Sequence, residues 1–236
     1  MKKQIYTRFF KMGHIGILIS GFLLVSAGIA LASGKGVLKD GDISTDGLTV
    51  INSTRTTTTE IKKDVDWSVY TTYQIAQAEV SFRKNWQQDY NKNRRSLSAQ
   101  VTDREMLRIR TAMANIFYEE LDRSLKKNSS LLKTDVADSG TLLFRPRIIN
   151  LDIYAPDVLG TDINYMRQAG KVTLFLEVFD AVSGEILGRW VDTREDPDKG
   201  YFDWANRITN EERMRLVIRR WSDRLAEGLS LMQADK

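Results

Sequence analysis

The feature that most constrains the fold is the stretch from Lys171 to Asp192, KVTLFLEVFDAVSGEILGRWVD. From residue 172 to residue 179, aliphatic side chains at even positions alternate with Thr, Phe and Glu at odd positions. This period of two places alternate side chains on opposite faces of a strand. Asp180 can hydrogen-bond to the backbone that follows it, and Gly184 can take a positive φ angle. The stretch therefore predicts an antiparallel hairpin with one wholly aliphatic face.

Two long helices are predicted to cover that face. Thr102 and Glu105 have the spacing of a capping box, and apolar residues recur at intervals of three and four as far as about Lys127. A second helix is predicted from about Asn206 to Met232, with a capping box from Thr209 to Glu212.

Two further stretches are predicted to add strands. Tyr73 to Phe82 alternates small and apolar residues, and Leu142 to Tyr154 is rich in Leu and Ile. Because Pro146 has no N–H to donate, the second of these is expected to be an edge strand, or to be broken or bulged there. We therefore predict the α+β class: a two-layer domain, with a mostly antiparallel sheet and two long helices packed on one face. The domain is expected to span residues 61–236.

The N-terminus has the pattern of a secretory signal. Lys and Arg side chains precede an apolar run from Ile15 to Ala32, which ends in Ala-Leu-Ala. We predict a signal peptide at residues 1–32, cleavage before Ser33, and a periplasmic protein. The alternative is an uncleaved inner-membrane anchor formed by residues 15–32. Residues 33–60, rich in Gly, Ser and Thr, are predicted to be a flexible tether.

The composition excludes several classes of function. The chain has 35 Lys and Arg and 31 Asp and Glu, but the first 32 residues contain four of the basic residues and no acid. The remainder is balanced, which argues against nucleic-acid binding. Its one basic cluster, Asn91 to Arg95, is expected to be a solvated loop. His14 is the only histidine and there is no cysteine, so imidazole or thiol catalysis is excluded after cleavage. We expect no cofactor and no metal.

Three short stretches carry a resemblance to a known family: Ala78 to Trp86 with Tyr90-Asn91, Asp180 to Glu185, and Trp221 to Leu225. They resemble a family of uncharacterised proteobacterial envelope proteins, many of them lipoproteins, classed as a domain of unknown function. The resemblance covers roughly Asp66 to Leu229 and implies no catalytic residue. The lipoproteins have a Cys directly after the signal, where this chain has Ser33, so a lipid anchor is not implied.

The first functional hypothesis is a non-catalytic periplasmic module that binds another envelope protein or assists it. Tyr201, Phe202 and Trp204 are the candidate partner-binding residues, because exposed aromatics are frequent anchors of interfaces. The alternative is that they fold back and fill the end of the core beneath the C-terminal helix. The long polar connection from Ala155 to Gly170 and an edge strand are further candidates. Membrane contact is expected only through the N-terminal segment, if it is not cleaved. The oligomeric state is left open.

The second hypothesis is a periplasmic glycan hydrolase with two catalytic carboxylates, which needs neither His nor Cys. Such an enzyme requires two carboxyl groups about 5 to 10 Å apart in one cleft. Trp190 and Trp204 offer surfaces on which sugar rings stack. The acids considered are Glu177, Asp192, Glu195 and Asp203.

Overall fold

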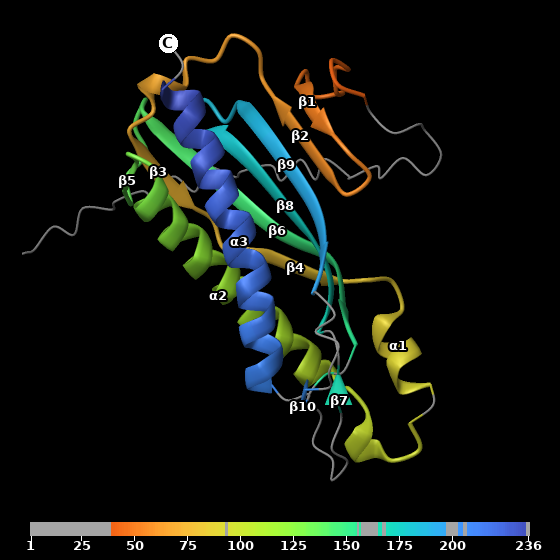
Figure 1. The fold of residues 1–236 in the computed structure, drawn as a ribbon. Helices are drawn as coiled ribbons and strands as arrows, with labels where there is room; N and C mark the ends of the chain where they lie inside the picture. Colours follow the sequence, from red (N-terminus) through yellow and green to blue (C-terminus); the bar gives the residue numbers. More distant parts are fainter. Residues whose placement is uncertain are drawn as a thin grey trace, which may run out of the picture. The chain divides into compact units, whose positions relative to one another are not determined.

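The hairpin predicted around residues 171–192 is present as two long antiparallel strands, β8 (Gly170–Asp180) and β9 (Ile186–Glu195) (Figure 1). The computed structural model describes residues 39–92, 94–154, 156, 165–166, 169–196, 203–204 and 207–234. In the turn, the Asp180 carboxylate accepts hydrogen bonds from the N–H groups of Val182 and Ser183, and Gly184 has a φ angle of 72°. The predicted turn is confirmed.

Within the described residues, the hairpin belongs to an eight-stranded sheet with the order β1-β2-β9-β8-β6-β3-β5, in which β4 also pairs with β6. The other strands of this sheet are β1 (Thr49–Ser53), β2 (Thr57–Ile61), β3 (Thr72–Ile75), β4 (Glu79–Phe82), β5 (Leu132–Lys133) and β6 (Thr141–Ile153). From β1 to β6 the neighbouring strands are antiparallel, whereas β3 and β4 run parallel to β6 and β5 runs parallel to β3.

The α+β class is confirmed, and most of the strand pairing is antiparallel, but the sheet is mixed because β3, β4 and β5 add parallel pairings at one side. The reason is the position of helix α2 (Asp103–Asn128), which lies between β4 and β6 in the chain. A helical crossover returns the chain to the same end of the sheet, so the strands before and after it run in the same direction.

The single strand predicted from Tyr73 to Phe82 is two strands, β3 and β4, which pair in turn with β6. Pro146 lies where one partner ends and the next begins: the Ala76 N–H bonds to the Phe144 carbonyl, and β4 pairing starts at Arg147. Residues two apart in a strand, such as Phe144 and Pro146, point their backbone groups to the same side. The Pro146 nitrogen therefore faces the gap between the end of β3 and the start of β4. β6 is therefore central, and it is the partner strand that is broken.

The tether predicted for residues 33–60 is wrong from Thr49 onward. Residues 49–53 and 57–61 form β1 and β2, and β2 pairs with β9 from Thr57 opposite Asp192 to Ile61 opposite Gly188. The run of threonines that resembled a linker is β-branched, and β-branched residues pack well on a pleated surface.

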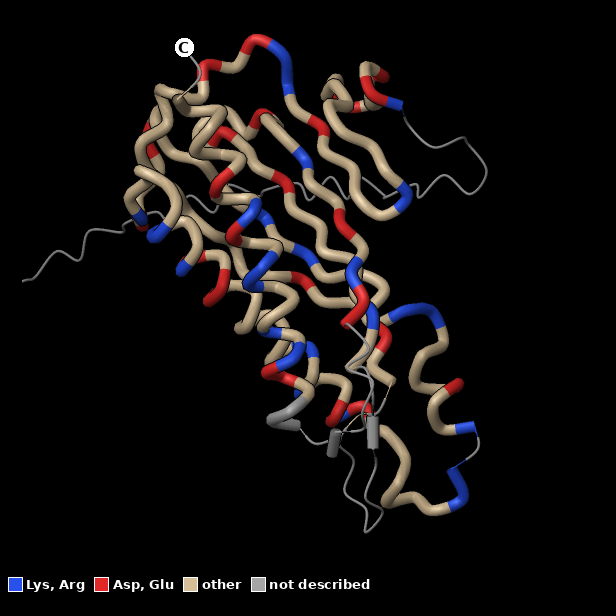
Figure 2. The backbone as a smooth tube through the Cα atoms, in the orientation of Figure 1, with Lys and Arg blue, Asp and Glu red and all other residues tan. Residues whose placement is uncertain are grey.

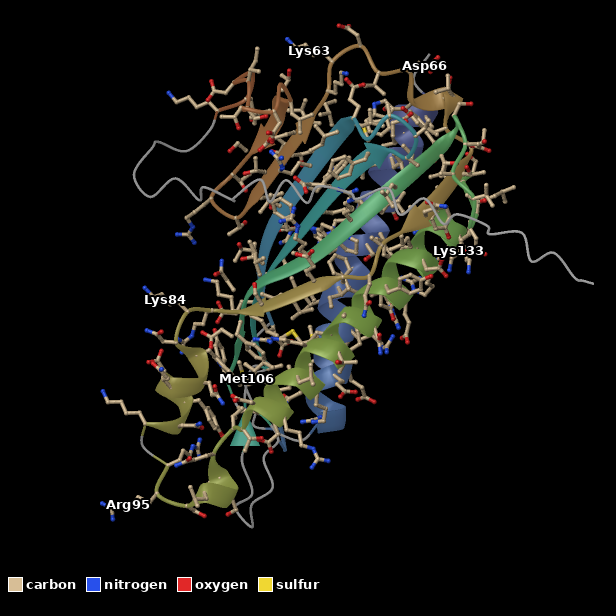
Figure 3. All side chains as sticks on the ribbon, turned by 180° about the vertical axis from the view of Figure 1, so that it is seen from behind. Lys63, Asp66, Lys84, Arg95, Met106 and Lys133 are labelled. Atoms are coloured by element: carbon tan, nitrogen blue, oxygen red, sulfur yellow. The ribbon has the colours of Figure 1, made fainter. Side chains whose placement is uncertain are left out.

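The two long helices, α2 and α3 (Arg207–Ala234), lie side by side against one face of the sheet (Figures 1 and 3). The Thr102–Glu105 capping box is confirmed. The box predicted at Thr209 is wrong, because α3 already begins at Arg207. The core between the helices and the sheet includes the following fully buried side chains: Phe117, Leu121, Phe144, Ile148, Leu174, Leu176 and Ile218. The remaining elements are short: η1 (Trp67–Val69), α1 (Trp86–Asn91), η2 (Leu97–Ala99), β7 (Tyr165–Met166) and β10 (Asp203–Trp204).

Candidate functional site

The two segments predicted to bind a partner meet in a small separate sheet. β10 pairs antiparallel with β7, so that the backbone of Trp204 lies opposite that of Tyr165. β7 belongs to the polar connection between Ala155 and Gly170, the other predicted binding segment. Of the aromatic candidates, Tyr201 and Phe202 lie outside the described residues, and Trp204 is placed by its backbone. The structure thus brings together two regions that are far apart in the sequence.

A buried ion pair fixes the place where both segments leave the large sheet. The Asp196 carboxylate accepts hydrogen bonds from the Arg213 guanidinium at 2.9 Å and from the Ala169 N–H at 2.8 Å. The Asp196 N–H donates to the Gly170 carbonyl at 2.9 Å. The Arg213 and Asp196 side chains are 4% and 7% exposed, so this pair ties the end of β9 and the start of β8 to α3 inside the protein.

Gly170 is required at this junction by the close approach of β6. A Cβ atom at Gly170 would lie 2.1 Å from the Asp152 carbonyl oxygen, far inside van der Waals contact. The first position of β8 is therefore one that only glycine fits.

A small cavity lies beside this junction, between α2, α3 and the end of β6. Its volume is about 30 Å³, and its wall is mostly apolar, with Ile109, Met113, Ile153, Ala169 and Met214 among the lining residues. A drug-sized ligand fills a pocket of about 300 to 1,000 Å³, whereas one water needs only about 10 to 15 Å³. The cavity is too small for a substrate such as a sugar.

The acids considered for glycan hydrolysis are held by neighbouring polar groups. Glu177 accepts hydrogen bonds from Arg147 at 2.6 Å and from Arg189 at 3.1 Å. Asp192 accepts from Thr57 at 3.0 Å and from Arg194 at 2.8 Å. Such pairing stabilises the fold and leaves neither carboxylate free to face a substrate.

The strand register also separates these acids. Glu177 lies opposite Arg189, whereas Asp192 lies opposite Leu174, which points to the helices, so Glu177 and Asp192 are on opposite faces of the sheet. Glu195 shares the Glu177 face, but it lies opposite Lys171, six residues along β8, or about 20 Å away at about 3.4 Å per residue. The structure describes Asp203 by its backbone only. The described acids of this set therefore form no catalytic pair.

The sheet face away from the helices, seen in Figure 3, is covered by its own long side chains. Arg189 bonds to the carboxylates of Asp46, Glu60 and Glu177, from three different segments of the chain. The guanidinium of Arg147 lies 4.8 Å from the centre of the Phe175 ring. Sequence reasoning missed this network, because its members are brought together only by the strand register.

A second network joins α2 to α3. Glu120, 2% exposed, accepts hydrogen bonds from Arg123 of its own helix and from Arg215 and Arg219 of α3. Burial raises the pKa of Glu120, but these guanidiniums outweigh it and hold the pKa at about 2. The spacing of Arg215 and Arg219, one turn apart on a helix, is a signal from which this contact could have been found.

Ser124 of α2 belongs to the same interface. Its side chain is fully buried, and its hydroxyl donates to the Asp223 carboxylate of α3 at 2.6 Å. It therefore joins two helices and is not exposed as a nucleophile. Among the described residues, no group of three or more His, Cys, Asp or Glu is arranged to hold a metal ion, and no helix is long and apolar enough to cross a membrane.

Comparison with known proteins gives likenesses of structure only. No protein-family model matches the chain, and no curated protein matches it. A PelC dodecamer from Paraburkholderia phytofirmans has 7% sequence identity and a TM-score of 0.36, with 74% of this chain and 97% of that chain covered. A protein from Xanthomonas campestris assigned to DUF330 has 8% identity and a TM-score of 0.39, with coverage of 71% and 87%. A PDZ domain protein from Parabacteroides distasonis has 12% identity and a TM-score of 0.36, with coverage of 76% and 35%. At these values the likenesses carry no statement about activity or partners.

Proposed function

We propose that this protein is a non-catalytic module of the cell envelope, built as a two-layer α+β domain, that binds another envelope protein through its β7–β10 end. The observation that carries the proposal is the pairing of Trp204 with Tyr165 in β10 and β7, which joins both predicted binding segments. The buried Asp196–Arg213 pair gives these segments a rigid base. A rigid base lowers the entropy lost when a partner binds.

The pairing of the acidic side chains with arginines supports a binding role over catalysis. Glu177, Asp192 and Glu120 are each engaged by at least one arginine, and a catalytic acid needs an environment that leaves it free to exchange a proton with substrate. The glycan-hydrolase alternative has no observation in its favour among the described residues.

The double variant Tyr201→Ala, Trp204→Ala tests the proposal in the full chain. We expect its thermal melt to match that of the wild type, while proteins crosslinked to the wild type in intact envelopes are lost. Val182→Ala is the matched control, because Val182 is an apolar side chain with 65% exposure in the hairpin turn, and its crosslinks should be unchanged. A stability loss of about 3 kcal/mol or more would make the aromatics part of the core, and a normal melt with unchanged crosslinks would place the contact elsewhere.

The proposed location rests on the N-terminal signal. We expect the protein extracted from envelopes to begin at Ser33, as N-terminal sequencing would show. A species that begins at Met1 would instead indicate an anchor formed by residues 15–32.

A further inference from the structure

Positive charge is concentrated at one end of the domain. Residues 83–110, named here the basic lobe, contain eight Lys and Arg and three Asp and Glu, whereas the rest of residues 39–236 contains 22 and 28. The lobe comprises α1, η2 and the first two turns of α2, and Figure 2 shows its basic positions at the bends before and after α1. The balanced composition of the whole chain conceals this separation.

The basic side chains of the lobe are largely unneutralised. Lys84, Lys92, Arg95 and Arg104 are exposed, and none of them forms an ion pair with any residue that the structure describes. Lys84 and Arg95 extend away from the rest of the domain (Figure 3). Unpaired charges of one sign attract an oppositely charged surface at a distance set by the ionic strength.

The three acids of the lobe are used internally. Asp89 pairs with Arg83, Asp103 accepts a hydrogen bond from Gln87 at 3.0 Å, and Glu105 closes the capping box of α2. They hold the lobe together, and with eight basic residues against three acids the lobe keeps a surplus of positive charge.

Two exposed leucines stand among these basic residues. Leu97, in η2, is 81% exposed and follows Arg94 and Arg95 in sequence. Leu107 is 63% exposed and lies three residues after Arg104, on the same face of α2. Apolar side chains set among Lys and Arg are typical of surfaces that lie in the headgroup region of a bilayer.

The lobe is held rigidly against the end of the sheet. The rings of Phe82 and Trp86 stack at 4.5 Å, those of Trp86 and Tyr90 stack at 5.9 Å, and the Arg94 guanidinium lies 4.4 Å from the centre of the Tyr90 ring. The Trp86 indole N–H donates to the Ile153 carbonyl at 3.1 Å. These aromatics fall in the motif that carries the family resemblance, and they present the lobe in one preformed arrangement.

We propose that the basic lobe docks on a membrane surface that carries anionic lipid headgroups. The exposed Lys and Arg bind the headgroup phosphates, and Leu97 and Leu107 enter the boundary between headgroups and acyl chains. The surplus of acids in the rest of the domain is repelled by the same surface, so the lobe faces the membrane. This contact is additional to any N-terminal anchor and separate from the β7–β10 contact proposed above.

A second copy of the chain is a poorer match for the lobe than a lipid surface. Glu120, Glu177 and Asp192 are buried and bound to arginines, so these three acids are not open to the lobe of a second copy. A lipid surface presents both unpaired phosphates and the apolar layer that the leucines require.

The chain has no cysteine, so a single introduced thiol can report on the lobe. The full-length Leu97→Cys variant, labelled with an environment-sensitive fluorophore, is mixed with vesicles of phosphatidylcholine alone or with phosphatidylglycerol added. We expect a blue shift only with the anionic vesicles, and its loss in about 1 M salt, where the screening length falls to about 3 Å. When the same label is placed at Val182→Cys, in the hairpin turn, its emission should not shift with either kind of vesicle. Because the comparison is between two positions of one chain, membrane binding by residues 15–32 does not imitate the result.

Charge variants give the second arm of the test. Each basic residue near an anionic surface strengthens binding about fivefold, so replacing four should weaken the lipid-dependent shift at least about a hundredfold. The lobe variant combines Lys84→Gln, Lys92→Gln, Arg95→Gln and Arg104→Gln. The control variant has the same change in charge at exposed residues elsewhere and should bind within about threefold of the wild type. It combines Arg55→Gln, Lys63→Gln, Lys127→Gln and Arg220→Gln.

Three results would overturn the proposal. The first is an equal shift of the Leu97 label with neutral and anionic vesicles, and the second is unchanged binding by the lobe variant. The third is a lobe variant that alters the sedimentation of the chain without lipid and leaves the vesicle shift intact, which would make the lobe an interface between copies. If the fourfold variant does not melt like the wild type, the double variant Lys84→Gln, Arg95→Gln replaces it. Its binding to anionic vesicles should be about 25-fold weaker than that of the wild type.

Discussion

The two faces of β8 are buried to a similar extent by different means. On one face Leu174 and Leu176 are fully buried beneath helices α2 and α3. On the other, Phe175 and Glu177 are 6% and 7% exposed, although no helix covers that face of the sheet (Figure 3). There the arginine side chains of neighbouring strands lie over the ring and bind the carboxylate. The comparison shows that long charged side chains can close a sheet face that has no second layer, because their aliphatic stems cover apolar surface.

The largest effect is expected on the helix-covered face. Leu176→Ala should lower the free energy of unfolding by about 4 kcal/mol, because it removes buried methyl groups and leaves a cavity in a packed core. Denaturant unfolding measures this change. Val182→Ala, in the exposed turn of the same hairpin, should stay within about 0.5 kcal/mol of the wild type. A cost below about 1 kcal/mol for Leu176→Ala would mean that the helices do not pack on this face as described.

The uncovered face should be nearly as sensitive at one residue. Arg189→Met keeps an apolar stem but leaves the carboxylates of Asp46, Glu60 and Glu177 without their shared cation, and we expect a loss of about 3 kcal/mol. Adding Glu60→Gln should restore part of that loss, because Glu60 is 5% exposed and Arg189 is its only cation among the described residues. If the two changes are strictly additive in denaturant unfolding, this face does not depend on the network.

The turn that joins β8 to β9 serves both faces. Gly184→Val should lower the free energy of unfolding by about 2 kcal/mol, because a β-branched residue is strained at a φ angle of 72°. Gly184→Ala should cost less, since nothing lies within 4 Å of a Cβ atom there and only the backbone conformation is unfavourable. Equal stability of the Val variant and the wild type would contradict the positive φ angle.

The smallest effect is expected from pH between 6 and 8, since no histidine or cysteine follows His14. On the helix side, the pKa of Glu120 is lowered from 4.5 to about 2 by its arginines, against the effect of burial. A group whose pKa is lowered on folding stabilises the protein above its unfolded pKa, and that stability is lost as the pH falls through the folded value. Melting temperatures should therefore be flat from pH 8 to pH 6 and fall between about pH 4.5 and pH 2. Glu120→Gln should be less stable at pH 7 and lose less on acidification, and a Tm change of more than a few degrees above pH 6 would indicate another titrating group.

Local patterns predicted the hairpin and the start of α2 because local interactions determine them. The aliphatic alternation in β8, the side chain of Asp180 in the turn and the Thr102 cap all act within a few residues. The division of β3 from β4 could not be predicted in this way. It depends on where each meets β6, and the same proline that suggested an edge strand lies at that division.

The charged networks could not be predicted from composition or periodicity. Glu177 was considered as a catalytic acid because it stands near Trp190 in sequence, but its partners Arg147 and Arg189 come from the two neighbouring strands. The β1–β2 hairpin was missed for a related reason. Threonine runs occur in both linkers and strands, and only pairing with β9, 135 residues away at Thr57 and Asp192, decides between them.

That pairing has a consequence for the order in which the chain folds. β6, β8 and β9 are close in sequence and can assemble as soon as residue 195 has been made, whereas β1 and β2 are synthesised first and must wait for β9. Closing a contact across 135 residues is slow, because the entropy of a long loop is lost before the pairing is gained. During synthesis or export, the threonine-rich β2 therefore has an edge without a partner strand until β9 arrives. A chaperone that binds extended chains would find its binding site at this edge of β2.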